Sequence, residues 1–416
     1  MIGRAWIVSV AAALACNARE SANRGQPTVA LGSNLDLPSG PSGQCETSGC
    51  LRATEHVGDY SRETLQQVTQ PGVTLENGYG IYTISFVSSG ALARATVAVP
   101  VGVAAPAAGW HIVANAHGTT GLDDPCRVAG TLWGAALAGT FGARGFVGVA
   151  VDYPGLGTPG SHPYLVADSE GHAVLDAIRA TQELARTQNI RLSKRAAIVG
   201  LSQGGHAALS AAARQRAYAP ELDVRAVAVV GPASAFAEHW RFGIRYDGPF
   251  VAVHAMLIYA WAKHYGWHGP PLWDPAVAPN IDRFMQEACM YSATGAPSLA
   301  DRLGTSAERI FSPEFLAAYR GGADWGAYAE FGTWFDANRI RPFPQTAAFK
   351  VFQGDQDDIV PQAATRQLVD ALRGGGMKVE YEVVPGAGHS DVAFGFVASN
   401  EHRTAESIAW LRDQLR

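Results

Sequence analysis

One serine in this chain has the sequence surroundings of an enzymatic nucleophile. Ser202 lies at the centre of Gly200-Leu201-Ser202-Gln203-Gly204, a G-x-S-x-G sequence. The apolar run before it, 196–199, predicts a buried strand, and the alanine-rich run after it, 205–213, predicts a helix. A serine between a strand and a helix occupies a tight, strained turn that projects its hydroxyl from the end of the sheet, and flanking glycines avoid collisions there. Ser202 is therefore predicted to be the nucleophile of covalent catalysis.

A serine nucleophile of this kind works with an acid and a histidine in a catalytic triad, and the acid follows a later strand than the serine. A cluster of carboxylates is found at such a position in this chain. The strand predicted over 348–353 leads into a loop that contains Asp355, Asp357 and Asp358. Asp355 is too close to the strand end to turn toward a neighbour. We assign the acid to Asp357 and keep Asp358 as the alternative, although a helix N-terminal turn enriched in carboxylates also explains Asp358.

A histidine follows the last predicted strand. Residues 378–384 alternate between polar and apolar side chains, which is typical of a strand, and they lead into the glycine-rich loop that contains His389. A general base needs mobility and access to the carboxyl end of the sheet. Of the 12 histidines in the chain, His389 alone has both the order and the setting, so we assign it as the base.

An oxyanion hole is expected where an earlier strand ends. The strand predicted over 110–116 leads into His117-Gly118-Thr119. Acyl-transfer enzymes of this kind take one backbone N–H from such a loop and another from the residue after the nucleophile. Thr119 and Gln203 are therefore the predicted donors. His117 is predicted to brace the loop, and the same structural role is predicted for Asp152, which ends the strand over 145–151.

These motifs together resemble those of the α/β-hydrolases, and in finer detail those of the secretory lipase family of the fungal lipase A type. The resemblance covers roughly residues 70–415 and rests on four segments: 117–121, 152–157, 200–205 and 354–361. It implies an α/β fold with a mostly parallel central sheet flanked by helices, hydrolysis of carboxylic esters, and no cofactor. The histidine-glycine pair in the first segment differs from the pattern expected of the fungal members, so fungal substrate preferences should not be transferred wholesale.

The stretch before the acid strand predicts a helical insertion. Residues 232–344 lack the strand pattern, are interrupted by prolines and glycines, and are dense in aromatic side chains. The strand–turn–helix unit around Ser202 is called the nucleophile elbow, and its helix the elbow helix. Residues 232–344 come after the strand that follows the elbow helix, where hydrolases usually carry a cap. We therefore expect a catalytic domain over 51–416 with a helical cap at 232–344. Any single aromatic is expected in the cap's own core, and together they suit an apolar substrate.

The N-terminus has the features of an export signal. A short basic start precedes an apolar run and an Ala-x-Ala cleavage sequence, so residues 1–15 are predicted to be a signal peptide. Cys16 follows directly, which leaves lipid anchoring and plain secretion as alternatives. Residues 16–50 are rich in Gly, Ser, Pro and Asn and are predicted to be a flexible leader. The first folded elements are expected to be paired strands at 81–87 and 92–99.

Four cysteines remain after Cys16, and an even number in an exported protein suggests two disulfides. Three connectivities are open. Local pairing of Cys45 with Cys50 leaves Cys126, near the predicted oxyanion loop, to pair with Cys289 in the cap. No cysteine spacing indicates a zinc site. His264 and His268 have a helical ligand spacing but no nearby acid, so we expect no metal.

Charge and composition limit the partners. The net charge is −5 and no basic cluster is present, so nucleic acid is not expected, and no dinucleotide or phosphate-binding motif is found. We expect a small-molecule or lipid ester as substrate, with contact at a lipid interface left open and no obligate protein partner. The predicted function is a secreted lipase or esterase. The alternatives are a serine peptidase of the same fold, an acyltransferase, and an inactive binding protein on the scaffold.

Overall fold

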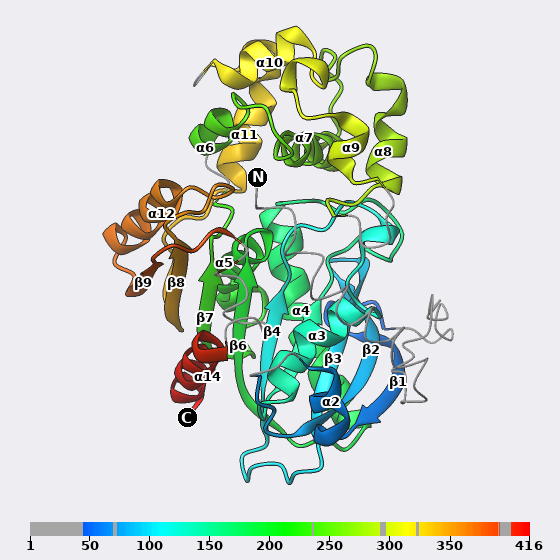
Figure 1. Cartoon of the computed structure of the whole chain (residues 1–416), viewed down its shortest axis with the longest axis vertical. Helices are drawn as coiled ribbons and strands as arrows, with labels where there is room; N and C mark the ends of the chain where they lie inside the picture. The colour runs from blue at the N-terminus through cyan, green and yellow to red at the C-terminus, as the bar shows by residue number, and fades with distance from the viewer. Residues whose placement is uncertain are drawn as a thin grey trace.

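The computed structural model describes residues 45–69, 73–234, 237–291, 297–321, 324–389, 391 and 401–416. One sheet of nine strands forms its centre, in the order β1-β2-β3-β5-β4-β6-β7-β8-β9 (Figure 1). The strands are β1 Leu51–Tyr60, β2 Gly78–Ser88, β3 Ala91–Val101, β4 Trp110–Ala116, β5 Val147–Val151, β6 Leu192–Leu201, β7 Asp223–Val230, β8 Ala348–Gly354 and β9 Val379–Val384.

The sheet is antiparallel at one end and parallel over the rest. The pairs β1/β2, β2/β3 and β3/β5 are antiparallel, and the neighbours from β5 through β9 are parallel. In the parallel part, Ala116 pairs with Gly200, Leu201 with Val230, and Val230 with Phe352. The carboxyl ends of β4, β6, β7 and β8 therefore meet at one edge. The loops that leave the strands at this edge contain the predicted site residues.

Helices cover both faces of the sheet. Along β4, Ile112 and Ala114 join the core cluster that contains α4 and α5, whereas Val113 joins the cluster that contains α14 and part of α3. This alternation is the expected result of the two-residue period of a strand. The covering helices are α2 Arg62–Val68, α3 Leu132–Gly142, α4 Ala167–Thr187, α5 Gln203–Tyr218, α12 Gln362–Gly374 and α14 Glu401–Leu415, with a single 3-10 turn η1 at Asp124–Cys126.

The segment between β7 and β8 forms a separate helical layer, which Figure 1 shows beyond the end of the sheet. Its elements are α6 Ala237–Gly243, α7 Val251–Tyr265, η2 Ala278–Asn280, α8 Ile281–Glu287, α9 Leu299–Leu303, η3 Ala307–Arg309, α10 Pro313–Arg320, η4 Gly326–Tyr328 and α11 Ala329–Ala337. The layer has its own core, whose largest fully buried side chains are Trp261, Phe311, Phe315, Tyr319, Phe331 and Phe335. These aromatic side chains therefore pack within the layer.

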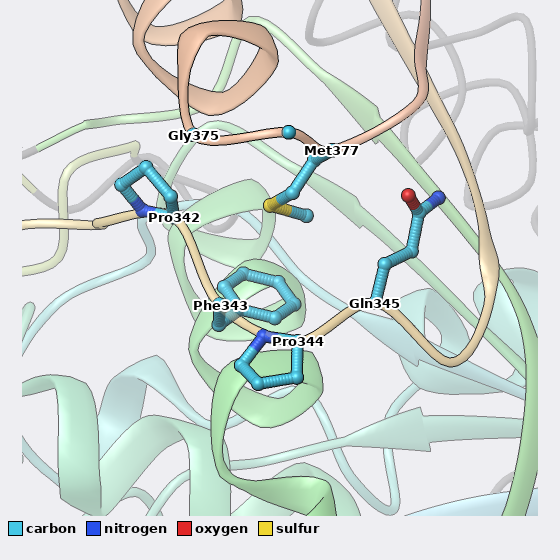
Figure 2. Close-up of a pocket in the computed structure, with 7 residues that line it drawn as sticks. Pro342, Phe343, Pro344, Gln345, Gly375 and Met377 are labelled. Atoms are coloured by element: carbon cyan, nitrogen blue, oxygen red, sulfur yellow. The ribbon is translucent and has the colours of Figure 1, made fainter.

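A surface pocket of about 380 Å³ lies where the chain enters β8 and β9 (Figure 2). It is lined by Pro342–Gln345 and Gly375–Met377. Because both segments precede their strands, the pocket lies at the amino ends of β8 and β9. The predicted acid and histidine follow the carboxyl ends of the same strands, so this pocket is not part of the predicted site.

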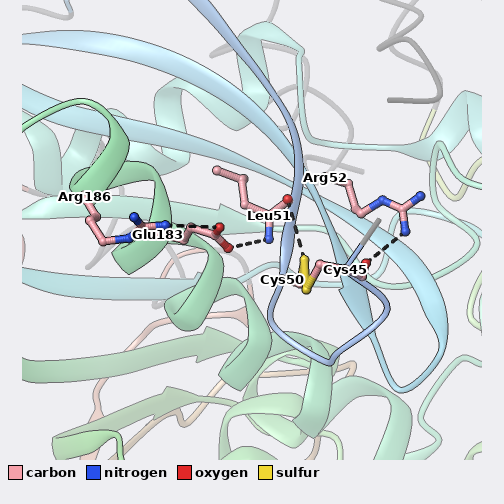
Figure 3. Close-up of a disulfide and its surroundings, with 6 residues drawn as sticks. All are labelled: Cys45, Cys50, Leu51, Arg52, Glu183 and Arg186. Atoms are coloured by element: carbon pink, nitrogen blue, oxygen red, sulfur yellow. Dashed lines mark hydrogen bonds and ion pairs between the residues drawn. A yellow bond between two sulfur atoms is a disulfide. The ribbon is translucent and has the colours of Figure 1, made fainter. Parts of the chain in front are cut away.

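The folded part begins earlier than the sequence pattern indicates. Strand β1 was not predicted, and residues 45–50 of the predicted leader are attached to the sheet. Gly49 N donates to Val87 O (2.7 Å), Val87 N donates to Cys50 O (3.0 Å), and Cys45 is disulfide-bonded to Cys50. Figure 3 shows this disulfide beside Leu51, whose N–H donates to the Glu183 carboxylate of α4 (2.9 Å).

The predicted leader therefore extends too far, because its last six residues, 45–50, belong to the fold. The predicted signal peptide and Cys16 lie outside the described residues. No helix in the described ranges is long and apolar enough to span a membrane.

Candidate active site

Ser202 lies in a strained turn between β6 and α5. Its φ of 55° and ψ of −115° are unusual for a residue with a side chain. Ser202 N donates to Val230 O (2.9 Å), and Ser202 O accepts from Ala233 N (3.0 Å), so the turn is tied to the end of β7 on both sides. Its flanking glycines are required sterically. A Cβ on Gly200 would lie 2.0 Å from Gly204 O, and a Cβ on Gly204 would lie 1.8 Å from Ala116 O.

The loop after β8 brings Asp357 to His389. The Asp357 Oδ2 accepts a 2.7 Å hydrogen bond from His389 Nδ1, and both side chains are nearly buried, at 2% and 8% exposure. The second oxygen, Oδ1, accepts from Ile359 N (3.0 Å) and Val360 N (2.8 Å), which fixes the carboxylate within its own loop. Because His389 donates from Nδ1, its Nε2 remains available to take a proton.

The two neighbouring carboxylates have other environments. Asp355 is exposed and its Oδ1 accepts from Gly386 N (2.7 Å), so it braces the loop after β9. Asp358 is also exposed. Of the three aspartates in this loop, Asp357 is the one that the structure pairs with His389.

Gly231 brings the serine turn and the aspartate–histidine pair together. It follows Val230, the residue that holds Ser202 N, and its own N–H donates to Phe352 O (3.0 Å). A Cβ at Gly231 would lie 3.1 Å from Asp357 Oδ2 and 3.2 Å from His389 Nδ1, and its φ of +45° also disfavours a side chain. The acid and histidine therefore lie against the end of β7, where the Ser202 turn is anchored.

A polar residue at the end of β8 supports the acid and was not predicted. Gln353 is fully buried, and its Nε2 donates to Asp357 Oδ2 (2.9 Å) and to Val360 O (3.0 Å). Its Oε1 accepts from Thr365 Oγ1 of α12 (2.5 Å). A glutamine next to the last residue of β8, directly before the loop that contains Asp357, is the sequence signal that could have identified it.

The loop after β4 packs against the serine turn. A Cβ on Gly118 would lie 3.4 Å from Leu201 O, so the loop passes close to the residue before Ser202. Thr119 follows directly and its Oγ1 shares a 2.9 Å hydrogen bond with the buried Tyr164 hydroxyl. Gln203 occupies the first position of α5, where backbone N–H groups have no partner within the helix. Thr119, in the loop after β4, and Gln203, at the start of α5, therefore both lie next to the Ser202 turn.

His117 and Asp152 brace this region, as their sequence positions predict. Both side chains are buried, and His117 Nε2 lies 2.9 Å from Asp152 Oδ1. The Asp152 carboxylate also accepts from Val128 N (2.9 Å) and Ala129 N (2.6 Å). These contacts use the carboxylate fully, so Asp152 is structural and not a second catalytic acid.

Solved structures with this architecture are described as hydrolases, esterases and lipases. A candidate hydrolase from Legionella pneumophila has a TM-score of 0.74 and 22% identity, covering 88% of this chain and 98% of that one. The rice cell wall degrading esterase LipA from Xanthomonas oryzae has a TM-score of 0.71 and 18% identity, covering 89% and 100%. The chain has the α/β-hydrolase fold. Closed-state lipase A from Candida antarctica is more distant, with a TM-score of 0.60 and 16% identity over 84% and 80%.

Sequence comparisons relate parts of this chain to two enzyme families. The secretory lipase profile matches residues 136–263, which include the serine turn, and the prolyl oligopeptidase profile matches 299–416, which include Asp357 and His389. Lipase A of Moesziomyces aphidis is 33% identical over 105 residues, or 25% of this chain, and the match spans 21% of that relative's length. The predicted resemblance to secretory lipases is confirmed in the elbow-containing part.

The second disulfide joins η1, which follows the loop after β4, to the helical layer. Cys126 of η1 is bonded to Cys289, with Cα atoms 5.4 Å apart, and Met290 N donates to Thr120 O (2.8 Å) beside it. In the described residues, no group of three or more histidine, cysteine or acidic side chains is arranged to hold a metal.

Loss of this disulfide is expected to destabilise the protein. The Cys126→Ser/Cys289→Ser variant should lose roughly 2–4 kcal/mol of unfolding free energy, because the crosslink closes a very long loop. Urea unfolding measures the loss, with Cys45→Ser/Cys50→Ser as a matched control that opens a loop of only 5 residues and should lose less. An equal loss in the two variants would contradict this ranking.

Proposed function

We propose that the chain is a serine carboxylic-ester hydrolase, a secreted lipase or esterase, with Ser202, His389 and Asp357 as its catalytic triad. The observation that carries the proposal is the close approach of the buried Asp357–His389 side chains to Gly231, one residue beyond the β7 carbonyl that anchors Ser202. The similarity to secretory lipases and to an esterase of the same fold supports this assignment.

In the proposed reaction, the Ser202 hydroxyl attacks the ester carbonyl while His389 Nε2 removes its proton. Asp357 keeps the other ring nitrogen protonated, orients the ring and stabilises the imidazolium. The backbone N–H groups of Thr119 and Gln203 stabilise the tetrahedral oxyanion. His389 then protonates the departing alcohol. A water molecule, activated by His389, hydrolyses the acyl-enzyme and restores Ser202.

A comparison of the hydrolysis rates of an ester and an amide with the same acyl group tests the reaction class. A p-nitrophenyl ester and the p-nitroanilide with the same acyl group each release a coloured product, p-nitrophenol or p-nitroaniline, so both reactions can be followed by absorbance. The ester should be hydrolysed far faster. The prolyl oligopeptidase match makes a peptidase the second candidate, so prolyl p-nitroanilides belong in the same assay. Faster cleavage of a prolyl anilide than of every ester would replace the proposed function with that of a peptidase.

Acyl-chain dependence is expected to reveal an apolar pocket beneath residues 232–344, which we treat as the cap. Each methylene buried there contributes about 0.8 kcal/mol to binding, so kcat/KM should rise from acetyl to medium-chain p-nitrophenyl esters until the pocket is full. Exposed Phe242 and Tyr246 on the cap, at 55% and 59%, suit contact with a lipid interface. A higher kcat/KM for acetyl than for octanoyl esters would contradict a lipase and favour a short-chain esterase.

Export is part of the same proposal. The secretory lipase match and the two disulfides support it, since disulfides persist in oxidising compartments. We propose that the mature chain begins at Cys16. The mass of the mature protein separates a diacylglycerol-modified Cys16 from an unmodified start.

A further inference from the structure

A buried carboxylate on α4 contacts the first turn of the elbow helix. Glu170 is fully buried, and its Oε1 accepts from Leu165 N (2.7 Å) and from Gln203 Nε2 (2.8 Å). Its Oε2 accepts from His206 Nδ1 (2.9 Å). Gln203 and His206 are one helical turn apart on α5. A single carboxylate therefore holds two points of the helix that begins directly after Ser202.

His206 balances the buried charge. Its Nδ1 faces the Glu170 carboxylate and its Nε2 faces Asn338 O (2.9 Å), and all three groups are buried. Both partners are acceptors, so the ring donates from both nitrogens when both hydrogen bonds are formed. An imidazolium and a carboxylate that are both fully hydrogen-bonded tolerate burial, whereas either one alone does not. The contact to Asn338, which follows α11, also connects the elbow helix to the end of the cap.

The side-chain amide of Gln203 has one favourable orientation. Its Nε2 donates to Glu170 and to His162 Nε2 (2.6 Å). Burial, with a further contribution from His117, lowers the pKa of His162 to about 3, so His162 is neutral and accepts this hydrogen bond. A flipped amide would direct its oxygen at the Glu170 carboxylate. The Gln203 Oε1 is buried without a hydrogen-bond partner in the described part of the chain, so the two donated bonds alone hold the amide.

We propose that Glu170 is a positioning residue for the oxyanion hole, acting through Gln203; this inference rests on the proposed ester hydrolase function. The backbone N–H of Gln203 stabilises the oxyanion in that function, and it belongs to the same residue whose side chain Glu170 holds. Fixing the amide and His206 fixes the first turn of α5, and with it the direction of that N–H. Preorganised donors stabilise a transition state because they need no rearrangement as charge develops.

The test uses two variants on the intact chain. Gln203→Met keeps the backbone N–H and the side-chain length but removes the amide, and it leaves the Glu170–His206 pair intact. Glu170→Gln removes the carboxylate charge. Each should lower kcat for p-nitrophenyl butyrate by roughly 10- to 100-fold, the range expected for a displaced catalytic donor, with KM changed less than about 3-fold. Gln203→Met alone decides the proposal if Glu170→Gln does not fold.

Inhibition by butaneboronic acid supplies the readout that separates positioning from stability. This compound forms a tetrahedral adduct on a nucleophilic serine, so its Ki should rise by the factor by which kcat/KM falls. The matched control is Asp176→Asn, because Asp176 is also a fully buried carboxylate on α4 but contacts Arg179 and Tyr218. It should lower the melting temperature while kcat and Ki remain within about 2-fold.

A double-mutant cycle completes the test. If Glu170 acts through Gln203, the double variant should be no more impaired in kcat than the worse single variant. Unchanged kcat and Ki in Gln203→Met, or additive effects in the double variant, would overturn the positioning role and leave the ester hydrolase intact. A wild-type protein that neither hydrolyses the ester nor binds the boronic acid would overturn both.

Discussion

Ser202→Ala is expected to lower kcat for p-nitrophenyl esters by a factor of roughly 10⁵ or more, because no other group then forms the acyl-enzyme. The residual rate should be that of a site that binds and polarises the ester without a nucleophile. Stopped assays with high enzyme concentration measure this rate. The turn itself should persist, since its hydrogen bonds at Ser202 use only the backbone N and O.

An unchanged melting temperature is the control for Ser202→Ala. A variant that keeps more than about a tenth of the wild-type kcat would exclude Ser202 as the nucleophile, given the loss expected for a triad serine. A low rate together with a collapsed melting temperature would instead indicate a folding defect. Ser210→Ala is the matched control, because Ser210 is buried further along α5 and has no role in the proposed chemistry.

Asp357→Asn is expected to lower kcat by about 10⁴-fold, since an amide at this position orients the histidine in the wrong tautomer. The structure supplies the reason, because Asp357 accepts the hydrogen bond of His389 Nδ1 and is itself fixed by two backbone N–H groups. The neighbouring Asp358→Asn is the matched control. Its side chain is exposed, so kcat should stay within about 2-fold, as for most surface substitutions.

The same pair of variants tests the acid assignment that the sequence left open. A larger loss in Asp358→Asn than in Asp357→Asn would contradict it. A comparable loss in both would indicate that the loop, and not one carboxylate, is what the substitutions disturb. Melting temperatures of the two variants distinguish this outcome from a chemical one.

Sequence order predicted the parts of the site that depend on the carboxyl ends of parallel strands. Ser202, Asp357 and His389 each follow a recognisable apolar or alternating strand, so their convergence at one edge follows from the parallel pairing. The choice of Asp357 over Asp355 also has a visible basis. Asp355 directly follows β8 and its oxygen accepts from Gly386 N, whereas two residues further the chain has turned toward His389.

Other parts depend on contacts that no local pattern encodes. Glu170 and His206 lie on helices whose polar residues are expected to face solvent, and only the packing of α4 against α5 buries them as a pair. Strand β1 was missed because its residues are mostly half-exposed and include several charged side chains, as is common at a sheet edge. The attachment of residues 45–50 depends on pairing with β2, far along the chain.

Covalent labelling with a p-nitrophenyl alkylphosphonate, followed by peptide mass spectrometry, tests the central claim most directly. The reagent phosphonylates a serine only where a base removes its proton and an oxyanion hole stabilises the adduct. We expect one adduct, on Ser202, with loss of ester hydrolysis in proportion to labelling, and almost no labelling of Asp357→Asn in the same time. An adduct on another residue, or undiminished ester hydrolysis by a fully labelled protein, would contradict the account.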